Sequence, residues 1–152
     1  MIYKIALLNA QSGIGVTRGY WEYLAKALHY GLPHDSSALA GIGELVQEHQ
    51  VDALVMLEAE GESFRSQGLH QVEFASRISG LEHWAFHPTL TLFDMANMGN
   101  GVVTRHPMTS SQTHPLTAGI ERRGLGSSVI SLDGKNLHLL YTHLSLGQST
   151  RR

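Results

Sequence analysis

The chain has 152 residues, of which 42% are hydrophobic and 16% charged, and its 13 acidic residues slightly outnumber its 11 basic ones. This length is enough for about one domain with a sizeable core, and the near balance of charge gives no strong signal for nucleic acid as a partner. Cysteine is absent, which excludes disulfides, thiolate nucleophiles and zinc sites built on sulfur.

The first third of the chain is predicted to alternate strands and helices. Ile2 to Asn9 is a short apolar run followed by the turn residues Q-S-G-I-G, so a buried strand is expected to end at Asn9. Apolar residues then recur at helical spacing from Thr17 to Gly31, and again from Leu39 to Val46, with Asp35 or a neighbouring serine as the natural N-cap of the second helix. Val51 to Leu57 is a nearly continuous apolar run, the pattern of a strand covered on both faces.

The remainder is predicted to change from helices to antiparallel strands. Phe64 to Ile78 is a helix candidate, and Leu81 to Phe86 is a strand candidate. From Asn97 to Leu137 the chain is rich in Gly, Ser, Thr and Val in short alternating runs, which favours strands joined by turns. Asp133-Gly134 lies between two such runs and predicts a hairpin.

Two apolar runs end in a side chain that is capable of chemistry. Glu58 closes the run that begins at Val51, and the carboxyl end of a central strand is where open α/β sheets place their sites. His143 follows L-H-L-L-Y-T, where an imidazole could donate to a phosphate oxygen or move a proton. The alternatives are a carboxylate that only caps a strand or pairs with an arginine, and a histidine with a structural role.

Two asparagines could support such a site. Asn9 ends the first predicted strand and would give a hard divalent ion an amide neighbour for Glu58, although asparagine also favours turns. Asn100 stands between two glycines in G-N-G-V-V, either close to a ligand or in a turn before an edge strand. The ten histidines include no H-E-x-x-H pair, so their spacing does not support a zinc site.

Five segments carry a more specific pattern because they occur together and in order. They are L-N-A-Q-S-G at 8–13, V-D-A-L-V-M-L-E at 51–58, G-N-G-V-V-T-R-H-P at 99–107, E-R-R-G-L at 121–125 and Y-T-H-L at 141–144. In these segments the chain resembles the endonuclease/exonuclease/phosphatase superfamily, Mg²⁺-dependent phosphoesterases that include DNase I-like nucleases. The resemblance implies an α/β fold, a four-layer sandwich of two mixed sheets with helices outside.

The resemblance also implies roles for individual residues. Glu58 matches the metal-binding carboxylate, and Asn9 matches the asparagine beside it, with Mg²⁺ or Mn²⁺ as the cofactor. His143 matches the histidine that contacts the scissile phosphate. Asn100 matches a recurrent motif that is assigned here to the catalytic site, whereas Arg105 is expected to be structural.

The chain departs from the family pattern in its second half. Its 152 residues contain neither the G-D-x-N segment nor the terminal Asp-His pair that supplies the general base. We therefore expect residues 1–152 to form a single truncated domain, a partial DNase I-like sandwich whose C-terminal half is missing. The intact protein would hydrolyse a phosphodiester or phosphomonoester, and this chain alone would be inactive or nearly so.

A non-catalytic short form that acts as an interaction module is the alternative. An unpaired apolar sheet edge tends to recruit another chain, so self-association through such an edge is expected. The sequence shows neither a signal-peptide core nor a run of about 20 apolar residues, which favours a cytoplasmic protein without a transmembrane segment.

Overall fold

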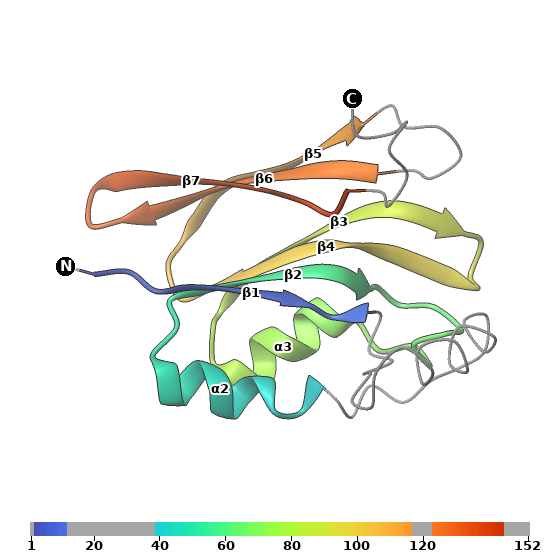
Figure 1. Cartoon of the computed structure of the whole chain (residues 1–152), viewed down its shortest axis with the longest axis horizontal. Helices are drawn as coiled ribbons and strands as arrows, with labels where there is room; N and C mark the ends of the chain where they lie inside the picture. Colours follow the sequence, from blue (N-terminus) through green and yellow to red (C-terminus); the bar gives the residue numbers. More distant parts are fainter. Residues whose placement is uncertain (1, 12–38, 117–122, 145–152) are drawn as a thin grey trace.

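The structure is a computed structural model that describes residues 2–11, 39–116 and 123–144 (Figure 1). Its elements in chain order are β1 (Ile5–Asn9), α2 (Ile42–His49), β2 (Ala53–Glu60), α3 (Gln71–Ser79), β3 (His83–Leu92), β4 (Ala96–Thr104), β5 (Met108–Leu116), β6 (Arg123–Leu132) and β7 (Lys135–Thr142). The predicted change from alternating strands and helices to consecutive strands is confirmed.

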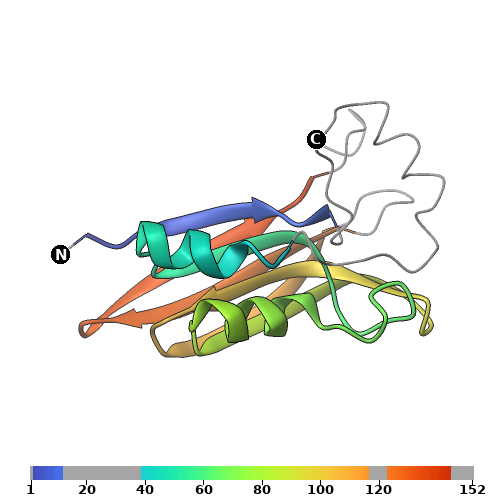
Figure 2. The same ribbon diagram turned by 90° about the horizontal axis from the view of Figure 1, so that it is seen from below.

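The strands form two sheets that pack face to face. The first sheet has the order β1-β2-β4-β3 and the second the order β5-β6-β7. Strands β1 and β2 are parallel, and the other neighbouring pairs are antiparallel. Helices α2 and α3 lie side by side on the outer face of the four-stranded sheet (Figures 1 and 2). The described residues thus form three layers, helices, sheet and sheet, and a helical layer outside β5-β6-β7 is not found among them.

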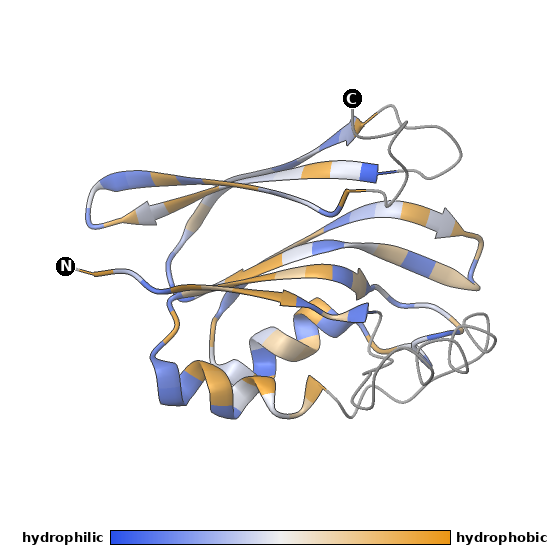
Figure 3. Ribbon diagram, in the orientation of Figure 1, coloured by the Kyte–Doolittle hydropathy of each residue, from blue (hydrophilic) through white to orange (hydrophobic). Residues whose placement is uncertain are grey.

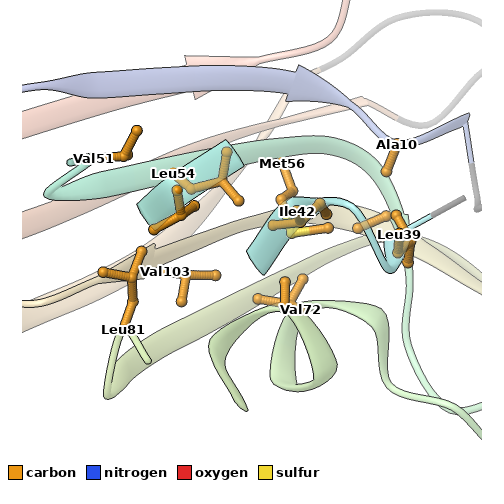
Figure 4. Packing of buried hydrophobic residues seen from close by; sticks show 12 residues of the cluster. Ala10, Leu39, Ile42, Val51, Leu54, Met56, Val72, Leu81 and Val103 are labelled. Atoms are coloured by element: carbon orange, nitrogen blue, oxygen red, sulfur yellow. The ribbon is translucent and has the colours of Figure 1, made fainter. Parts of the chain in front are cut away.

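The main hydrophobic core lies between the helices and the first sheet (Figure 4). Met56 and Val103 point from the sheet toward Val46 of α2 and Val72 of α3, and all four side chains are fully buried. Burying a side chain of this size contributes about 1.5 to 3 kcal/mol relative to leaving it in water. Helix α3 approaches closely because β4 carries Gly101, where an added Cβ would lie only 2.4 Å from Val72.

A second core lies between the two sheets and becomes polar toward β5. Val55, Val102 and Tyr141 form its buried centre. Beside them His87 of β3, 4% exposed, binds Ser111 and Thr113 of β5 through its two ring nitrogens, at 2.9 and 2.6 Å. Figure 3 shows the corresponding contrast, since β2 is hydrophobic over most of its length and β5 is largely hydrophilic. Hydroxyl groups and one imidazole therefore join the sheets where apolar side chains do not.

The predicted strands are present with shifted ends. Strand β1 begins at Ile5 rather than Ile2, β2 continues past Leu57 to Glu60, and β3 continues past Phe86 to Leu92. Strands β2 and β3 are both extended through an irregularity, between Met56 and Ala59 in β2 and after Pro88 in β3. The apolar run ends at Leu57, but backbone pairing continues across the bulge and both Ala59 and Glu60 are fully buried, so hydropathy marks the end of β2 too early.

The predicted helices are wrong in extent. Helix α3 begins at Gln71, seven residues after the predicted start at Phe64, and α2 begins at Ile42 after Gly41, whose hydrogen cannot act as a side-chain cap. Residues 61–69 form turns instead of helix because the buried carboxylate of Glu60 binds Ser63 and Arg65. The helix predicted from Thr17 to Gly31 and the cap predicted at Asp35 lie outside the described residues.

The hairpin prediction at Asp133-Gly134 is confirmed. Strand β6 ends at Leu132 and β7 starts at Lys135, and the two residues between them have φ values of 48° and 77°. Two consecutive left-handed residues are the requirement of the tight turns that suit twisted strands. Among the described residues, the two helices are each too short to cross a membrane.

Candidate active site

Glu58 sits in a distorted part of β2. In the pairing of β2 with β4, Met56 lies opposite Gly101 and Ala59 lies opposite Gly99. Strand β2 therefore has one residue more than β4 between these two pairs, which is a β-bulge. The backbone of Glu58 has a φ of 52°, a left-handed conformation that costs a non-glycine residue about 1 to 2 kcal/mol. Strain of this kind is found at functional sites, where a bulge turns a side chain out of the regular alternation.

His143 lies just beyond the end of β7, in the other sheet. Its Nδ1 is 3.0 Å from Oε1 of Glu58, and the two side chains are 28% and 23% exposed. Thr142, the last residue of β7, donates its hydroxyl to the carbonyl of Gly124 on β6 at 3.0 Å. The two runs in which the sequence suggested chemistry therefore bring their polar ends together.

Asn100 connects the two sheets beneath this pair. Its side chain is 3% exposed, its Oδ1 accepts from the backbone N–H of Glu58 at 3.3 Å, and its Nδ2 donates to the carbonyl of Gly124 at 3.4 Å. Strand β4, which carries Asn100, lies between β2 and β3, so the alternative of a turn before an edge strand is wrong. Asn100 thus holds the strained backbone of Glu58 against β6.

Arg123 adds a cation to the group. Its Nη1 lies 2.9 Å from Nδ1 of His143. A small pocket, called here the Glu58 pocket, is lined by Glu58, Thr89, Met98, Gly99, Asn100, Arg123 and His143. The pocket therefore combines one carboxylate with a guanidinium, an imidazole and an amide, so groups that attract a cation and groups that attract an anion lie next to one another.

Asn9 is at the same end of the sheet but not in this pocket. It pairs with Leu57, the residue before Glu58, and Ala10 donates its N–H to the carbonyl of Leu57 at 2.8 Å. Its side-chain oxygen accepts from the N–H of Gln11 at 3.0 Å. Asn9 lines a separate apolar pocket beside α2. The structure thus brings Glu58, Asn100 and His143 into contact and leaves Asn9 on the adjacent strand.

The donor set can be compared with the needs of a metal ion. In the described ranges no three His, Asp or Glu side chains gather closely enough to hold an ion by themselves. Mg²⁺ commonly takes only one or two carboxylates and completes its shell with water and substrate phosphate. Glu58 as a partly exposed carboxylate, with amide oxygens on neighbouring strands, fits such an ion and does not fit zinc.

Sequence reasoning did not assign a role to Arg123 or to Gly124. Both belong to the segment E-R-R-G-L, one of the five that carried the resemblance, so the signal was present without a function attached to it. Gly124 is needed for space, because an added Cβ would lie 3.0 Å from Thr89 and 3.3 Å from Thr113. Arg105, expected to be structural, donates its backbone N–H to the carbonyl of Asp52 at 2.9 Å, away from the pocket.

Comparison with solved structures identifies the fold. An endonuclease/exonuclease/phosphatase protein from Beutenbergia cavernae DSM 12333 matches 95% of this chain and 39% of its own, with a TM-score of 0.66 and 20% identity. A mannosyl-6-phosphatase of Bacteroides thetaiotaomicron VPI-5482 matches 99% of this chain and 55% of its own, with a TM-score of 0.65 and 13% identity. TDP2 of D. rerio, complexed with a single-strand DNA product, matches 96% and 47%, with a TM-score of 0.59 and 12% identity.

Sequence comparison adds nothing to these matches, since no protein-family model and no curated protein sequence matches the chain. The chain spans roughly half the length of the solved structures, or less. The shared part is the mixed α/β arrangement of two sheets described above, as the sequence predicted. The chain therefore carries a partial DNase I-like fold, that of the endonuclease/exonuclease/phosphatase proteins.

Proposed function

We propose that this chain supplies the cation- and phosphate-binding part of a Mg²⁺-dependent phosphoesterase. The observation that carries the proposal is the 3.0 Å contact between Glu58 and His143, which come from different sheets and meet beside the buried amide of Asn100. The fold supports the same reading, since proteins with this fold include a mannosyl-6-phosphatase and TDP2 bound to a DNA product.

Three residues of the Glu58 pocket, and Asn9 on the strand next to it, have distinct parts in this proposal. Glu58 holds Mg²⁺ or Mn²⁺, with Asn9 on the adjacent strand as a supporting oxygen donor. When bound, the ion neutralises charge on the phosphate and polarises its ester bond. His143 donates a hydrogen bond to a phosphate oxygen, and Asn100 keeps the backbone of Glu58 in position. The substrate is a phosphodiester or a phosphomonoester.

The described residues bring together only part of the groups that such hydrolysis needs. No second carboxylate or histidine joins the Glu58 pocket among the described residues. Loss of a general base commonly lowers the reaction rate by a factor of about 10² to 10⁴. The rate falls further when several catalytic groups that act together are missing. We therefore expect the chain by itself to bind a divalent ion weakly and to turn over phosphoesters slowly or not at all.

Ion binding and turnover can be tested separately. Titration calorimetry with Mn²⁺ and Mg²⁺ should detect weak binding that disappears in Glu58→Ala. Asp52→Asn is the matched control, because Asp52 is a carboxylate with the same 23% side-chain exposure just before the other end of β2. Equal binding by wild type and Glu58→Ala would contradict the assignment of Glu58.

Turnover should be measured with an aryl phosphodiester and an aryl phosphomonoester in the presence of each ion. We expect rates near background for the wild-type chain. Strong Mg²⁺-dependent hydrolysis that is lost in Glu58→Ala would support the phosphoesterase assignment and would overturn the expectation that these residues are insufficient.

A second candidate function is a binding module that uses the sheet edges left unpaired among the described residues. Strand β1 is an edge of its sheet, its five residues carry no charge, and Ile5 and Leu7 are 47% and 68% exposed. Strand β7 is an edge of the other sheet, and Leu140 on it is 67% exposed. Natural edge strands usually carry charges or bulges that prevent pairing, so an uncharged apolar edge favours association.

Light scattering after size-exclusion chromatography tests this second function. We expect concentration-dependent dimers or larger species, and fewer of them in Leu7→Lys, which places a charge on the edge. Leu45→Lys is the control, because Leu45 is 46% exposed but lies on α2. A monomer at all concentrations would contradict self-association.

A further inference from the structure

One nitrogen of His143 contacts two groups of opposite charge. Nδ1 lies 3.0 Å from the carboxylate oxygen Oε1 of Glu58 and 2.9 Å from the guanidinium nitrogen Nη1 of Arg123. Both contacts that the described residues make with this ring use Nδ1, so Nε2 on the other side of the ring is the nitrogen left to meet a ligand.

The two contacts demand different proton positions. A guanidinium has five N–H donors and no acceptor, so Arg123 can bond to Nδ1 only if Nδ1 offers its lone pair. An ionised carboxylate has only acceptors, so Glu58 can bond to Nδ1 only if Nδ1 carries a proton. In a neutral imidazole one nitrogen is protonated and the other is not, which means that the two neighbours favour opposite tautomers.

We propose that Arg123 is a positioning residue that draws the ring proton of His143 to Nε2, against the opposing pull of Glu58. With the proton on Nε2, His143 is a neutral hydrogen-bond donor toward a phosphate oxygen. The use of this donor rests on the proposed function, because a hydrogen-bond donor at Nε2 matters only if an anion is bound there.

The fold explains how Arg123 can do this. Arg123 begins β6, and His143 follows the last residue of β7, the strand paired with β6, so both residues lie at the same end of one hairpin. Gly124, the next residue of β6, accepts hydrogen bonds from Thr142 and from Asn100. These bonds tie the hairpin end to the backbone of Glu58 and so hold Arg123, His143 and Glu58 at fixed separations.

Charge explains why the proton is assigned to Nε2 of His143 and not to Nδ1, where it would pair with Glu58. If Glu58 also holds a cation, the negative charge that favours a proton on Nδ1 is neutralised, whereas Arg123 keeps its charge at all relevant pH values. The same guanidinium then both selects the tautomer and adds positive potential where a phosphate would bind.

Nitrogen-15 NMR of the imidazole ring tests the proposal on the whole chain without metal or substrate. The shifts of the two ring nitrogens report which one is protonated, and the His143 signals are identified by their loss in His143→Asn. All spectra are recorded at the same mildly alkaline pH, so that the tautomer ratio is compared between variants under one condition. We expect Arg123→Met to move the proton toward Nδ1, with a change in tautomer ratio on the order of tenfold, as for one hydrogen bond to a charged group.

Arg123→Lys is the conservative variant, and it should restore a ratio close to wild type because it keeps a cationic donor. An unchanged ratio in Arg123→Met overturns the proposal. If Arg123→Met loses the wild-type amide spectrum, the decisive comparison is Glu58→Gln with wild type. Removal of the opposing carboxylate must then move the proton toward Nε2, and no movement overturns the proposal. The measurement needs no turnover, so it can fail while the phosphoesterase assay succeeds, or succeed while that assay fails.

Discussion

Glu58 and His143 belong to different sheets, and yet their side chains meet with 3.0 Å between Oε1 and Nδ1. The contact exists because β2 is distorted at Glu58 and because β7 ends just before His143. Taken alone, Glu58 and His143 could each have the structural role that the sequence also allowed. Their meeting makes the distance between the two sheets part of the site, since a change in sheet packing would separate carboxylate and imidazole.

The strained backbone at Glu58 predicts a conflict between stability and function. Glu58→Gly should be more stable than Glu58→Ala by about 1 kcal/mol, because glycine accepts a φ of 52° without a Cβ penalty. Denaturant unfolding of both variants measures the difference. Gln50→Gly compared with Gln50→Ala calibrates it, since Gln50 has a φ of 51° at the end of α2. Equal stability of the two Glu58 variants would contradict strain at this residue.

The buried ion pair between Glu60 and Arg65 predicts a large asymmetric effect. Glu60 is fully buried, and its Oε2 lies 2.8 Å from Nη2 of Arg65. Arg65→Met leaves this carboxylate without its cation and should cost about 3 to 5 kcal/mol of unfolding free energy. Adding Glu60→Gln should recover part of the loss, because the amide is neutral and its oxygen can still accept from the N–H of Asn97. A double variant less stable than Arg65→Met would contradict this account.

The close approach of α3 to β4 predicts a rescue. Gly101→Ala would place a Cβ 2.4 Å from Val72 and should destabilise the protein by about 1 to 3 kcal/mol. Val72→Ala alone should also destabilise, by removing buried methyl groups. The double variant should lose less than the sum of the two single losses, because the smaller residue gives room to the new methyl group. Additive losses in thermal or denaturant unfolding would show that these residues are not in conflict.

Burial of His87 predicts a pH dependence. Desolvation lowers the pKa of His87 below its ordinary value of about 6.5, and His114 nearby acts in the same direction. The unfolded chain therefore binds more protons as the pH falls below about 6.5, and unfolding free energy should decline until the pH reaches the folded-state pKa. His87→Gln should weaken this decline, whereas His138→Gln, at an exposed residue, should leave it unchanged. The same decline in His87→Gln as in wild type would contradict the effect.

The sequence predicts strands more accurately than helices, for identifiable reasons. The run ending at Leu57 and the hairpin at Asp133-Gly134 follow local rules of hydropathy and turn geometry. The first part of the helix expected from Phe64 is replaced by turns because Glu60 and Arg65 form a tertiary ion pair, which local spacing cannot reveal. Local preference is a weak guide wherever buried polar groups determine the backbone path.

The site shows the same division. Glu58 and His143 are the polar ends of apolar runs, and ordered motifs suggested that they belong together. Their contact depends on how the two sheets stack, and so does the position of Arg123 beside it. The sequence of a single strand does not predict this stacking. Asn9 was expected beside Glu58 because it ends the first strand and matches an asparagine of the family pattern. The structure places it on the adjacent strand, opposite Leu57, and its assignment as a metal ligand stays a prediction.

Residues 61–69 contain no helix or strand, yet most of their backbone amides have partners. Gly61 donates its N–H to the carbonyl of Asn97 at the start of β4, and Phe64 donates to the carbonyl of Asp94 between β3 and β4, both at 2.7 Å. The backbone N–H groups of Ser63 and Ser66 each bond to the hydroxyl of the other residue. In amide hydrogen exchange such a segment should be protected like the strands beside it, not exchange like a surface loop. Residues 61–69 would then move together with the β3–β4 hairpin. The end of the sheet next to Glu58 would therefore be rigid, and would not open and close over the site.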